Sequence, residues 1–343
     1  MPKTDGSRRA RTWFLTLSIC GVLLAGLIAI FVRHEPASDL PKNSGPPSKT
    51  VSGMPVVLSM ANLMELPGAQ LAQMDIALLN MLCAERLPGT VEINVSNLLT
   101  TLDQWAKRVQ SETDRHLYRF RTNPQDYYSS EAYFRMLMMA VVFYEDLNIR
   151  YNPERMSNPE SENPDDHFFA DSRDIFLHGL IGSRRMGTCS SMPVLYAAVG
   201  RRLGYPLKLV TTKAHLFLRW EDAKERFDLE ATGRGMNRYD DEHFRQWPFP
   251  VSDEEIRAEG YLKSLTAAEE LAVFLSLRGS CLREAGQIKE AAACYAQAAR
   301  LAPATRSYAL LQANLQQPRA PAQNLPLQKS VPDPNPLSSL KSP

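Results

Sequence analysis

Residues 185–193 have the sequence RMGTCSSMP, which places Cys189 close to the start of a predicted helix. Proline has no backbone N–H and is tolerated only near a first helical turn, so Pro193 fixes the helix start close to the cysteine. The helix is expected over Val194–Leu203, and Gly204 suits the position that ends it. Unpaired N–H groups and the positive end of the helix dipole there favour a thiolate over a thiol, and the same groups could stabilise an oxyanion.

A histidine and two acids follow on predicted strands. The expected strands are 207–210, 216–220 and 226–230, with a turn at 221–224. A helix followed by an antiparallel sheet indicates an α+β fold. His215 lies at the start of the second strand, in the segment 214–220, and Asp228 and Glu230 share one face of the third because side chains alternate along a strand. Either acid could orient the imidazole, which would give a Cys–His–acid triad with Cys189 as the nucleophile.

Each of these residues has a plainer interpretation when taken alone. A single cysteine is usually a small buried apolar residue, and a single strand histidine is usually a satisfied core residue. The combination of Gly187 before Cys189, a helix behind it and two carboxylates on a later strand favours catalysis. Asp165, Asp166 and His167 are adjacent and no second ligand pair has a suitable spacing, so no metal site is expected. The triad requires no metal or organic cofactor.

The same region resembles the core of the transglutaminase-like superfamily, whose members are papain-like enzymes with a cysteine-bearing helix packed on an antiparallel sheet. The residues that carry the resemblance are Gly187-Thr188-Cys189, Leu195, Arg202, Leu203-Gly204-Tyr205-Pro206, His215 and Leu229-Glu230-Ala231-Thr232. A helical N-terminal region and a tetratricopeptide-like end make the chain similar to the SirB-type branch in particular. The likeness covers roughly residues 70–300.

The resemblance implies a role for each matching position. Cys189 would be the nucleophile and His215 the general base. The family's acid precedes a Pro-Thr-like pair, and Glu230 occupies that place before Ala231-Thr232, with Asp228 as the alternative acid. Many SirB-type members lack the cysteine and serve as non-enzymatic modules, whereas this chain retains it. No side-chain oxyanion donor can be assigned, and solvated or structural roles are expected for Arg184, Arg185 and His178.

Composition bounds the class of protein. The chain has 343 residues, of which 44% are apolar and 22% charged, as in a globular protein. A formal net charge of +1 argues against nucleic-acid binding. The five cysteines form neither a disulfide framework nor a zinc motif. Cys281 and Cys294 fall on facing predicted helices and could form a disulfide outside the cytoplasm, although buried free thiols are the favoured alternative.

The N-terminus predicts a membrane anchor. Residues 12–32 carry no charge, and 21 helical residues rise about 31 Å, which matches a hydrocarbon core of roughly 30 Å. Arg8, Arg9 and Arg11 precede this segment and favour a cytoplasmic N-terminus with the rest of the chain outside. A cleaved signal peptide is the alternative, but the apolar run is longer than usual for one. The expected location is the inner membrane of a bacterial cell, as a single-pass protein.

The remaining organisation follows from helical periodicity. Helices are expected over 75–82, 97–105, 131–149 and 175–180, with a surface loop at 151–172. One tetratricopeptide-like helical pair is expected over 267–302, followed by a cap helix at 306–315. A single repeat is too short for an independent groove, so it is expected to pack on the catalytic domain, with binding of a protein partner as the alternative.

The expected segments are an anchor at 1–33, a linker at 34–55, a transglutaminase-like domain at 56–265, a helical module at 266–315 and a tail at 316–343. The expected function is a membrane-anchored acyl-transfer enzyme that hydrolyses an amide, peptide or ester bond of a protein or peptide substrate. The alternative is a catalytically silent scaffold that binds a protein partner at the membrane surface.

Overall fold

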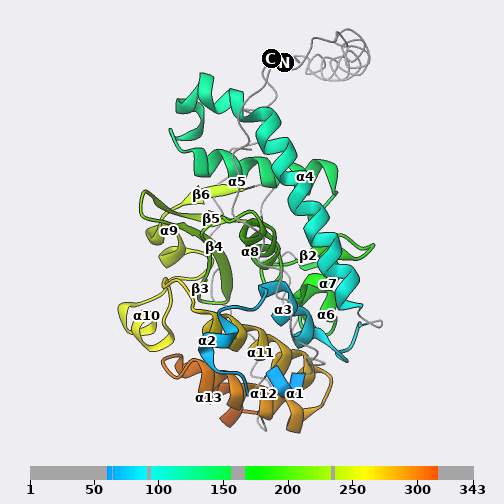
Figure 1. Ribbon diagram of the computed structural model, residues 1–343. Coiled ribbons are helices and arrows are strands. Elements are labelled where there is room, and N and C mark those ends of the chain that lie inside the picture. The colour runs from blue at the N-terminus through cyan, green and yellow to red at the C-terminus, as the bar shows by residue number, and fades with distance from the viewer. Residues whose placement is uncertain (1–59, 64, 91–93, 156–166, 233–235, 316–343) are drawn as a thin grey trace, which may run out of the picture. The chain divides into compact units, whose positions relative to one another are not determined.

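A four-stranded antiparallel sheet carries the predicted histidine and both predicted acids (Figure 1). Its strands follow one another in chain order: β3 (Leu207–Thr212), β4 (His215–Glu221), β5 (Arg226–Glu230) and β6 (Asn237–Tyr239). The three predicted strands are confirmed, and β3 and β4 extend beyond their expected ends. β6 was not predicted, because its three residues are too few to show an alternating pattern.

The computed structural model describes residues 60–63, 65–90, 94–155, 167–232 and 236–315. They fall in a unit that begins at Val57. The predicted anchor at 12–32, linker at 34–55 and tail at 316–343 lie outside the described residues. In the part of the chain that is described, no helix combines the length and the apolar character needed to cross a bilayer.

The two faces of the sheet contact different elements. Leu209, Leu218 and Leu229 share one face and join the main core, where helix α8 (Met192–Arg202) packs. The other face carries Phe217, which stacks on Phe244 of helix α9 (Asp241–Gln246) with ring centroids 3.7 Å apart. The alternation of side chains along β4 therefore places His215 on the face that α9 covers.

Helix α8 is the helix that was predicted to follow Cys189, and it ends close to the expected position. The helix ends at Arg202, and Gly204 adopts a left-handed φ of +76°. Gly200 lies against β3 so closely that a Cβ there would be 2.2 Å from Leu207. This close approach packs the C-terminal end of α8 against the start of β3.

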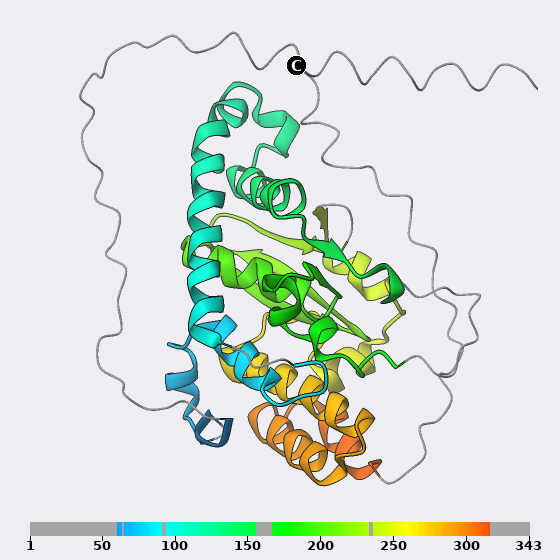
Figure 2. The ribbon, with the colours of Figure 1, turned by 90° about the vertical axis from the view of Figure 1, so that its right-hand side faces the viewer.

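The N-terminal helices form a second layer against α8. Asp75 caps α3 (Ile76–Ala84) by accepting a hydrogen bond of 2.7 Å from the N–H of Ala77. Helix α4 (Val95–Thr122) packs against α8 and α5 (Glu131–Val141) and is the long helix of Figure 2. It extends well beyond the predicted 97–105, because its charged second half conceals the apolar stripe.

The shorter elements are α1 (Met60–Leu63), α2 (Gly68–Leu71), η1 (Pro124–Tyr127), the π-helical turn η2 (Val142–Asp146), β1 (Arg150–Tyr151), η3 (Pro153–Arg155), α6 (Ser172–Ile175), α7 (Leu177–Ile181), β2 (Met186–Gly187) and α10 (Asp253–Glu259). The predicted surface loop at 151–172 is wrong at its start. Tyr151 pairs in parallel with Gly187, and Asn152 is buried.

The C-terminal helices are α11 (Ala267–Glu284), α12 (Ile288–Leu301) and α13 (Arg306–Ala313), close to the predicted pair and cap helix. Gly286 makes the turn between the first two with a φ of +75°. A Cβ on Gly279 would lie 2.7 Å from the Tyr295 ring, so the glycine permits the two helices to pack. Cys281 and Cys294 are buried free thiols. The tetratricopeptide likeness and the boundary at residue 265 stay predictions.

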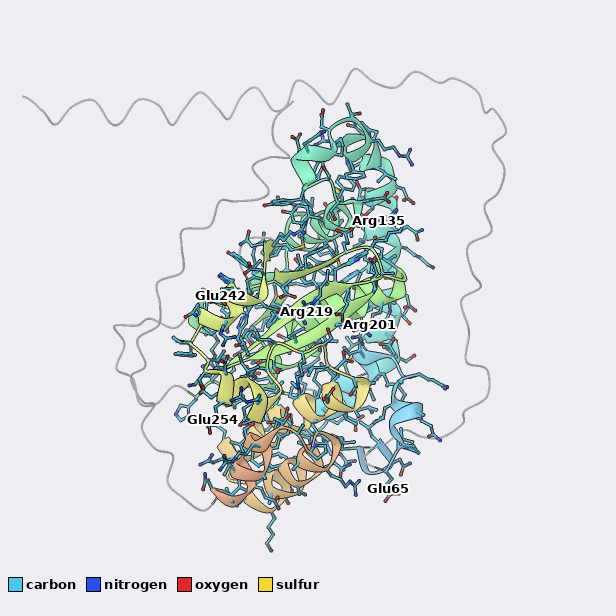
Figure 3. The ribbon with its side chains drawn as sticks, turned by 90° about the vertical axis from the view of Figure 1, so that its left-hand side faces the viewer. Glu65, Arg135, Arg201, Arg219, Glu242 and Glu254 are labelled. Atoms are coloured by element: carbon cyan, nitrogen blue, oxygen red, sulfur yellow. The ribbon has the colours of Figure 1, made fainter. Side chains whose placement is uncertain are left out.

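Helix α11 is fixed to the rest of the protein through buried polar contacts. Arg201 of α8, labelled in Figure 3, donates a hydrogen bond of 2.9 Å to the almost fully buried carboxylate of Glu270. Arg278 donates to the backbone carbonyls of Cys83 and Glu85 at 2.8 and 2.7 Å. The C-terminal helices therefore pack on the core, as expected.

Candidate active site

Cys189 lies in the turn between β2 and α8, three residues before the first residue of the helix. The helix itself starts at Met192, but the N–H of Met192 donates to the carbonyl of Thr188 at 2.9 Å, so a helical turn already encloses the cysteine. Pro193 occupies the first turn, as its missing N–H requires. The thiol is half-buried.

Hydroxyl groups hold this turn in place. Thr188 and Ser191 donate from their side chains to the backbone carbonyl of Asp174, at 2.8 and 3.1 Å. The Ser191 hydroxyl also accepts from the N–H of Thr188 at 3.1 Å. Gly187 is required beside it, because a Cβ would lie 2.5 Å from the Ser191 oxygen. The position of Cys189 is thus set by side chains on both sides of it.

The side chain of Asp174, whose backbone carbonyl binds this turn, is itself held by three polar partners. Its carboxylate, 1% exposed, accepts from Asn152 at 2.9 Å, from Arg155 at 2.9 Å and from Arg184 at 2.7 Å. This cluster gives Arg184 a structural role. Arg185 stacks on Trp105 with its guanidinium carbon 4.6 Å from the ring centroid, which is also a structural contact.

Replacing Asp174 with alanine is expected to lower the free energy of unfolding by about 2–4 kcal/mol, because it leaves the two arginines and the Asn152 amide without their shared acceptor. Urea denaturation measures the change. The matched control is Asp146→Ala, which breaks a more exposed ion pair with Arg108 and is expected to cost less than about 1 kcal/mol. Equal losses in the two variants would contradict a supporting role for Asp174.

His215 and Glu230 form a buried pair. The Nε2 of His215 lies 2.6 Å from Oε2 of Glu230, and both side chains are less than a tenth exposed. The other oxygen of Glu230 accepts from the N–H and hydroxyl of Thr232 at 2.7 and 2.5 Å. The acid is therefore held on one side and presents its free oxygen to the imidazole.

The second nitrogen of the imidazole is left for the cysteine. The side chains of His215 and Cys189 are hydrogen-bonded, and Nδ1 is the ring nitrogen that Glu230 does not occupy. Burial alone would lower the pKa of His215, but the Glu230 carboxylate and the Cys189 sulfur outweigh burial and raise this pKa from 6.5 to about 10. Burial alone would raise the pKa of Glu230, yet His215 and Thr232 hold it below its ordinary value.

Asp228, the alternative acid, has a different partner. It accepts two hydrogen bonds from the buried guanidinium of Arg219, at 2.5 and 3.0 Å. Arg219 also pairs with Asp241 of α9; Figure 3 labels it on the sheet. Burial raises the pKa of Asp228 to about 6 in spite of these bonds. Asp228 and Glu230 do share a face, but the contact with His215 is made by Glu230.

Two aromatic residues at the site were not predicted. The edge of the Trp247 ring meets His215, with ring centroids 4.7 Å apart and planes at 74°. The Tyr151 hydroxyl accepts from the backbone N–H of Cys189, and burial raises its pKa above the ordinary value. No local pattern marks either residue, because each reaches the site through contacts between distant segments. His178, in contrast, pairs with Ser172 at 3.2 Å, away from this group.

A cavity of about 550 Å³ opens beside Cys189 and His215. Tyr151 and Ser190 also line it, and the remaining walls come from the segment before α6, the β3–β4 hairpin, residues 259–265, α11 and α13. Its volume lies within the range of roughly 300–1,000 Å³ found for small-molecule sites. In the described part of the chain, no cluster of three or more potential ligands could hold a metal ion; His167 pairs with Glu284, and Asp165 and Asp166 are not described.

A comparison with known proteins finds a family match for part of the chain. Residues 96–247 match the model of a family described as the transglutaminase-like superfamily. The match runs from α4 to the end of α9 and includes Cys189, His215 and Glu230. No curated protein and no solved structure matches the chain. The mixed helices and sheet agree with a transglutaminase-like α+β core.

Proposed function

We propose that this protein is a transglutaminase-like cysteine hydrolase that cleaves an amide, peptide or ester bond through Cys189, His215 and Glu230. The observation that carries the proposal is the continuous hydrogen-bonded series from the Cys189 sulfur through the His215 ring to the Glu230 carboxylate. A buried imidazole placed between an acid and a half-buried thiol is the arrangement that nucleophilic catalysis by cysteine requires.

The reaction begins with the sulfur as an anion and the imidazole protonated. The Cys189 thiolate attacks the carbonyl carbon, a C–S bond forms, and the carbonyl electron pair moves onto oxygen. The backbone N–H of Cys189 and the Tyr151 hydroxyl, which are hydrogen-bonded to each other, lie beside this position, and we propose that they reorient to stabilise the oxyanion. When the intermediate collapses, the bond to the leaving group breaks and His215 protonates that group.

Water completes the cycle. His215, now neutral, takes a proton from a water molecule that attacks the thioester carbonyl, and the C–S bond breaks to release the acid and restore the thiolate. Glu230 stabilises the imidazolium in both steps without itself accepting the proton. Hydrolysis is proposed over transamidation because water is always present, whereas an amine acceptor needs its own shielded site.

The proposal also includes location and branch. Support for a single-pass anchor comes from the uncharged residues 12–32 and the preceding arginines, which favour a catalytic domain outside the cytoplasm of a bacterial cell. Support for the SirB-type branch comes from the helical segments on both sides of the matched region. A protein or peptide is the proposed substrate.

Trapping the acyl-enzyme tests the proposal. We expect 4-nitrophenyl acetate, an activated ester, to add one acetyl group to the protein, located on Cys189 by peptide mass spectrometry at acidic quench. Cys189→Ala is expected to abolish this adduct, and the matched variant Cys83→Ala removes a fully buried thiol and should leave it unchanged. No adduct on Cys189 in the folded wild-type protein would contradict the hydrolase and leave the scaffold function.

A further inference from the structure

The cavity extends from Cys189 to the C-terminal helices, and we infer that this extension binds an uncharged, bulky apolar side chain on the acyl part of the substrate. The inference rests on the proposed function for the reacting end of the cavity. It adds the substrate class, and it gives the C-terminal helices a part in binding.

Large apolar residues form the wall of the extension. They come from three segments far apart in the chain: Phe168 and Phe169 before α6, Val273 and Leu277 on α11, and Tyr308 and Leu311 on α13. Phe168, Phe169, Leu277 and Leu311 are only partly buried although they contact the core. Their remaining apolar surface faces a cavity or solvent, and a ligand that covers such surface gains affinity in proportion to the area removed from water.

The acidic residues of this wall are already engaged. Glu259 accepts from the N–H of Ser307 at 3.0 Å, next to Tyr308. Glu269 accepts from the N–H and hydroxyl of Thr266 at 2.7 and 2.8 Å in the cap of α11. A cationic side chain in the extension would therefore have to displace these hydrogen bonds in order to pair with either glutamate. It would also lose its hydration.

The basic residues offer little to an acidic side chain. Arg155 is bound to the carboxylate of Asp174. Lys263 is exposed, and among the described residues it has no ion-pair partner, so its charge is screened by water. Neither Arg155 nor Lys263 therefore favours an acidic side chain strongly. The occupant that fits this wall is a neutral apolar group.

The apolar extension is assigned to the acyl part of the substrate, because the leaving group must be released before hydrolysis. The leaving group and the attacking water both exchange protons with His215, so they must reach the cavity beside that ring. The acyl part stays attached to Cys189 until hydrolysis. An apolar pocket that holds the acyl part keeps the thioester in place while the other group leaves.

Selective labelling of Cys189 tests the inference. The probes are chloromethyl ketones of N-acetylated phenylalanine, leucine, glutamate and lysine, with iodoacetamide as a small reagent without a side chain. We expect the phenylalanine and leucine probes to modify Cys189 at least about 10-fold faster than the charged probes. Equal rates, or a preference for glutamate or lysine, would overturn the inference while the iodoacetamide rate still reports on the proposed function.

Two neighbouring leucines provide a matched pair of variants. Leu311 lines the cavity, whereas Leu310 on the same helix is 47% exposed and does not line it. Leu311→Gln is expected to slow the apolar probes about 10-fold and to leave the iodoacetamide rate unchanged, and Leu310→Gln should change neither. If Leu311→Gln does not fold, Phe169→Ala takes its place. If both Leu311→Gln and Phe169→Ala kept the wild-type preference for apolar over charged probes, the assignment of these residues to the binding wall would be overturned.

The inference can also be tested without catalysis. Dansyl-phenylalanine amide and dansyl-glutamate amide are titrated against folded Cys189→Ala, with dansyl fluorescence as the readout. Tighter binding of the phenylalanine compound, weakened in the double variant with Leu311→Gln, supports the pocket even if Cys189 proves unreactive. No preference for the phenylalanine compound would overturn it.

Discussion

Replacing His215 with alanine is expected to slow the reaction of Cys189 with iodoacetamide at pH 6 by about 10- to 100-fold. An ordinary thiol with a pKa of about 8.5 is only about 0.3% ionised at pH 6. The pKa of His215, raised to about 10 by Glu230 and Cys189 against the effect of burial, keeps the imidazole protonated at pH 6, where its charge favours the thiolate. Part of this gain is offset because a stabilised thiolate is a weaker nucleophile.

Peptide mass spectrometry measures that rate at Cys189 alone, since Cys83, Cys281 and Cys294 are buried. The control is His116→Ala, which removes a partly exposed histidine on α4 and is expected to leave the rate unchanged. An unchanged rate in folded His215→Ala would mean that the imidazole does not activate the sulfur.

Replacing Glu230 with glutamine is expected to reduce turnover by about 10²–10⁴-fold, because the amide cannot stabilise the imidazolium that forms in each step. The activated ester used for trapping provides the substrate for this assay. The isosteric matched control is Asp228→Asn. Asp228 lies on the same face of the strand as Glu230 but pairs with Arg219. Loss of turnover in Asp228→Asn with normal turnover in Glu230→Gln would assign the acid to Asp228 instead.

Glu230→Gln is also expected to change how the free energy of unfolding depends on pH. The raised pKa of His215 contributes stability that is fully present below its ordinary pKa of 6.5 and is lost as the pH rises through about 10. The lowered pKa of Glu230 contributes stability that is present above 4.5 and is lost as the pH falls through the lower value. Glu230→Gln is therefore expected to cost about 3–5 kcal/mol near pH 6 and progressively less toward pH 10.

Local patterns were sufficient to find the residues that are proposed to react. Pro193 and Gly204 bracket a helix, and the alternation of side chains along β5 puts both acids on one face, so Cys189, His215 and the two candidate acids could be selected without a structure. The choice between Glu230 and Asp228 needed the structure. Both satisfy the same alternation, and only the register of β4 against β5 sets Arg219 opposite Asp228 and leaves Glu230 for His215.

The surroundings of the site could not be predicted in the same way. Tyr151 reaches Cys189 through a parallel pairing with Gly187, across 36 positions that include residues without a described structure. Helix α11 was expected to pack on the domain, yet its periodicity does not indicate which side chains face the cavity. Such contacts depend on how separate segments meet in space, and neither helical nor strand periodicity encodes that.

The reaction of Cys189 with iodoacetamide in the unmodified protein, followed from pH 8 down to pH 6, is the most direct measurement of whether His215 activates the sulfur. A rate that falls less than about threefold over this range is the expected result, since the imidazolium is present throughout. A rate that falls by close to tenfold for each pH unit, as for an ordinary thiol, would contradict the account.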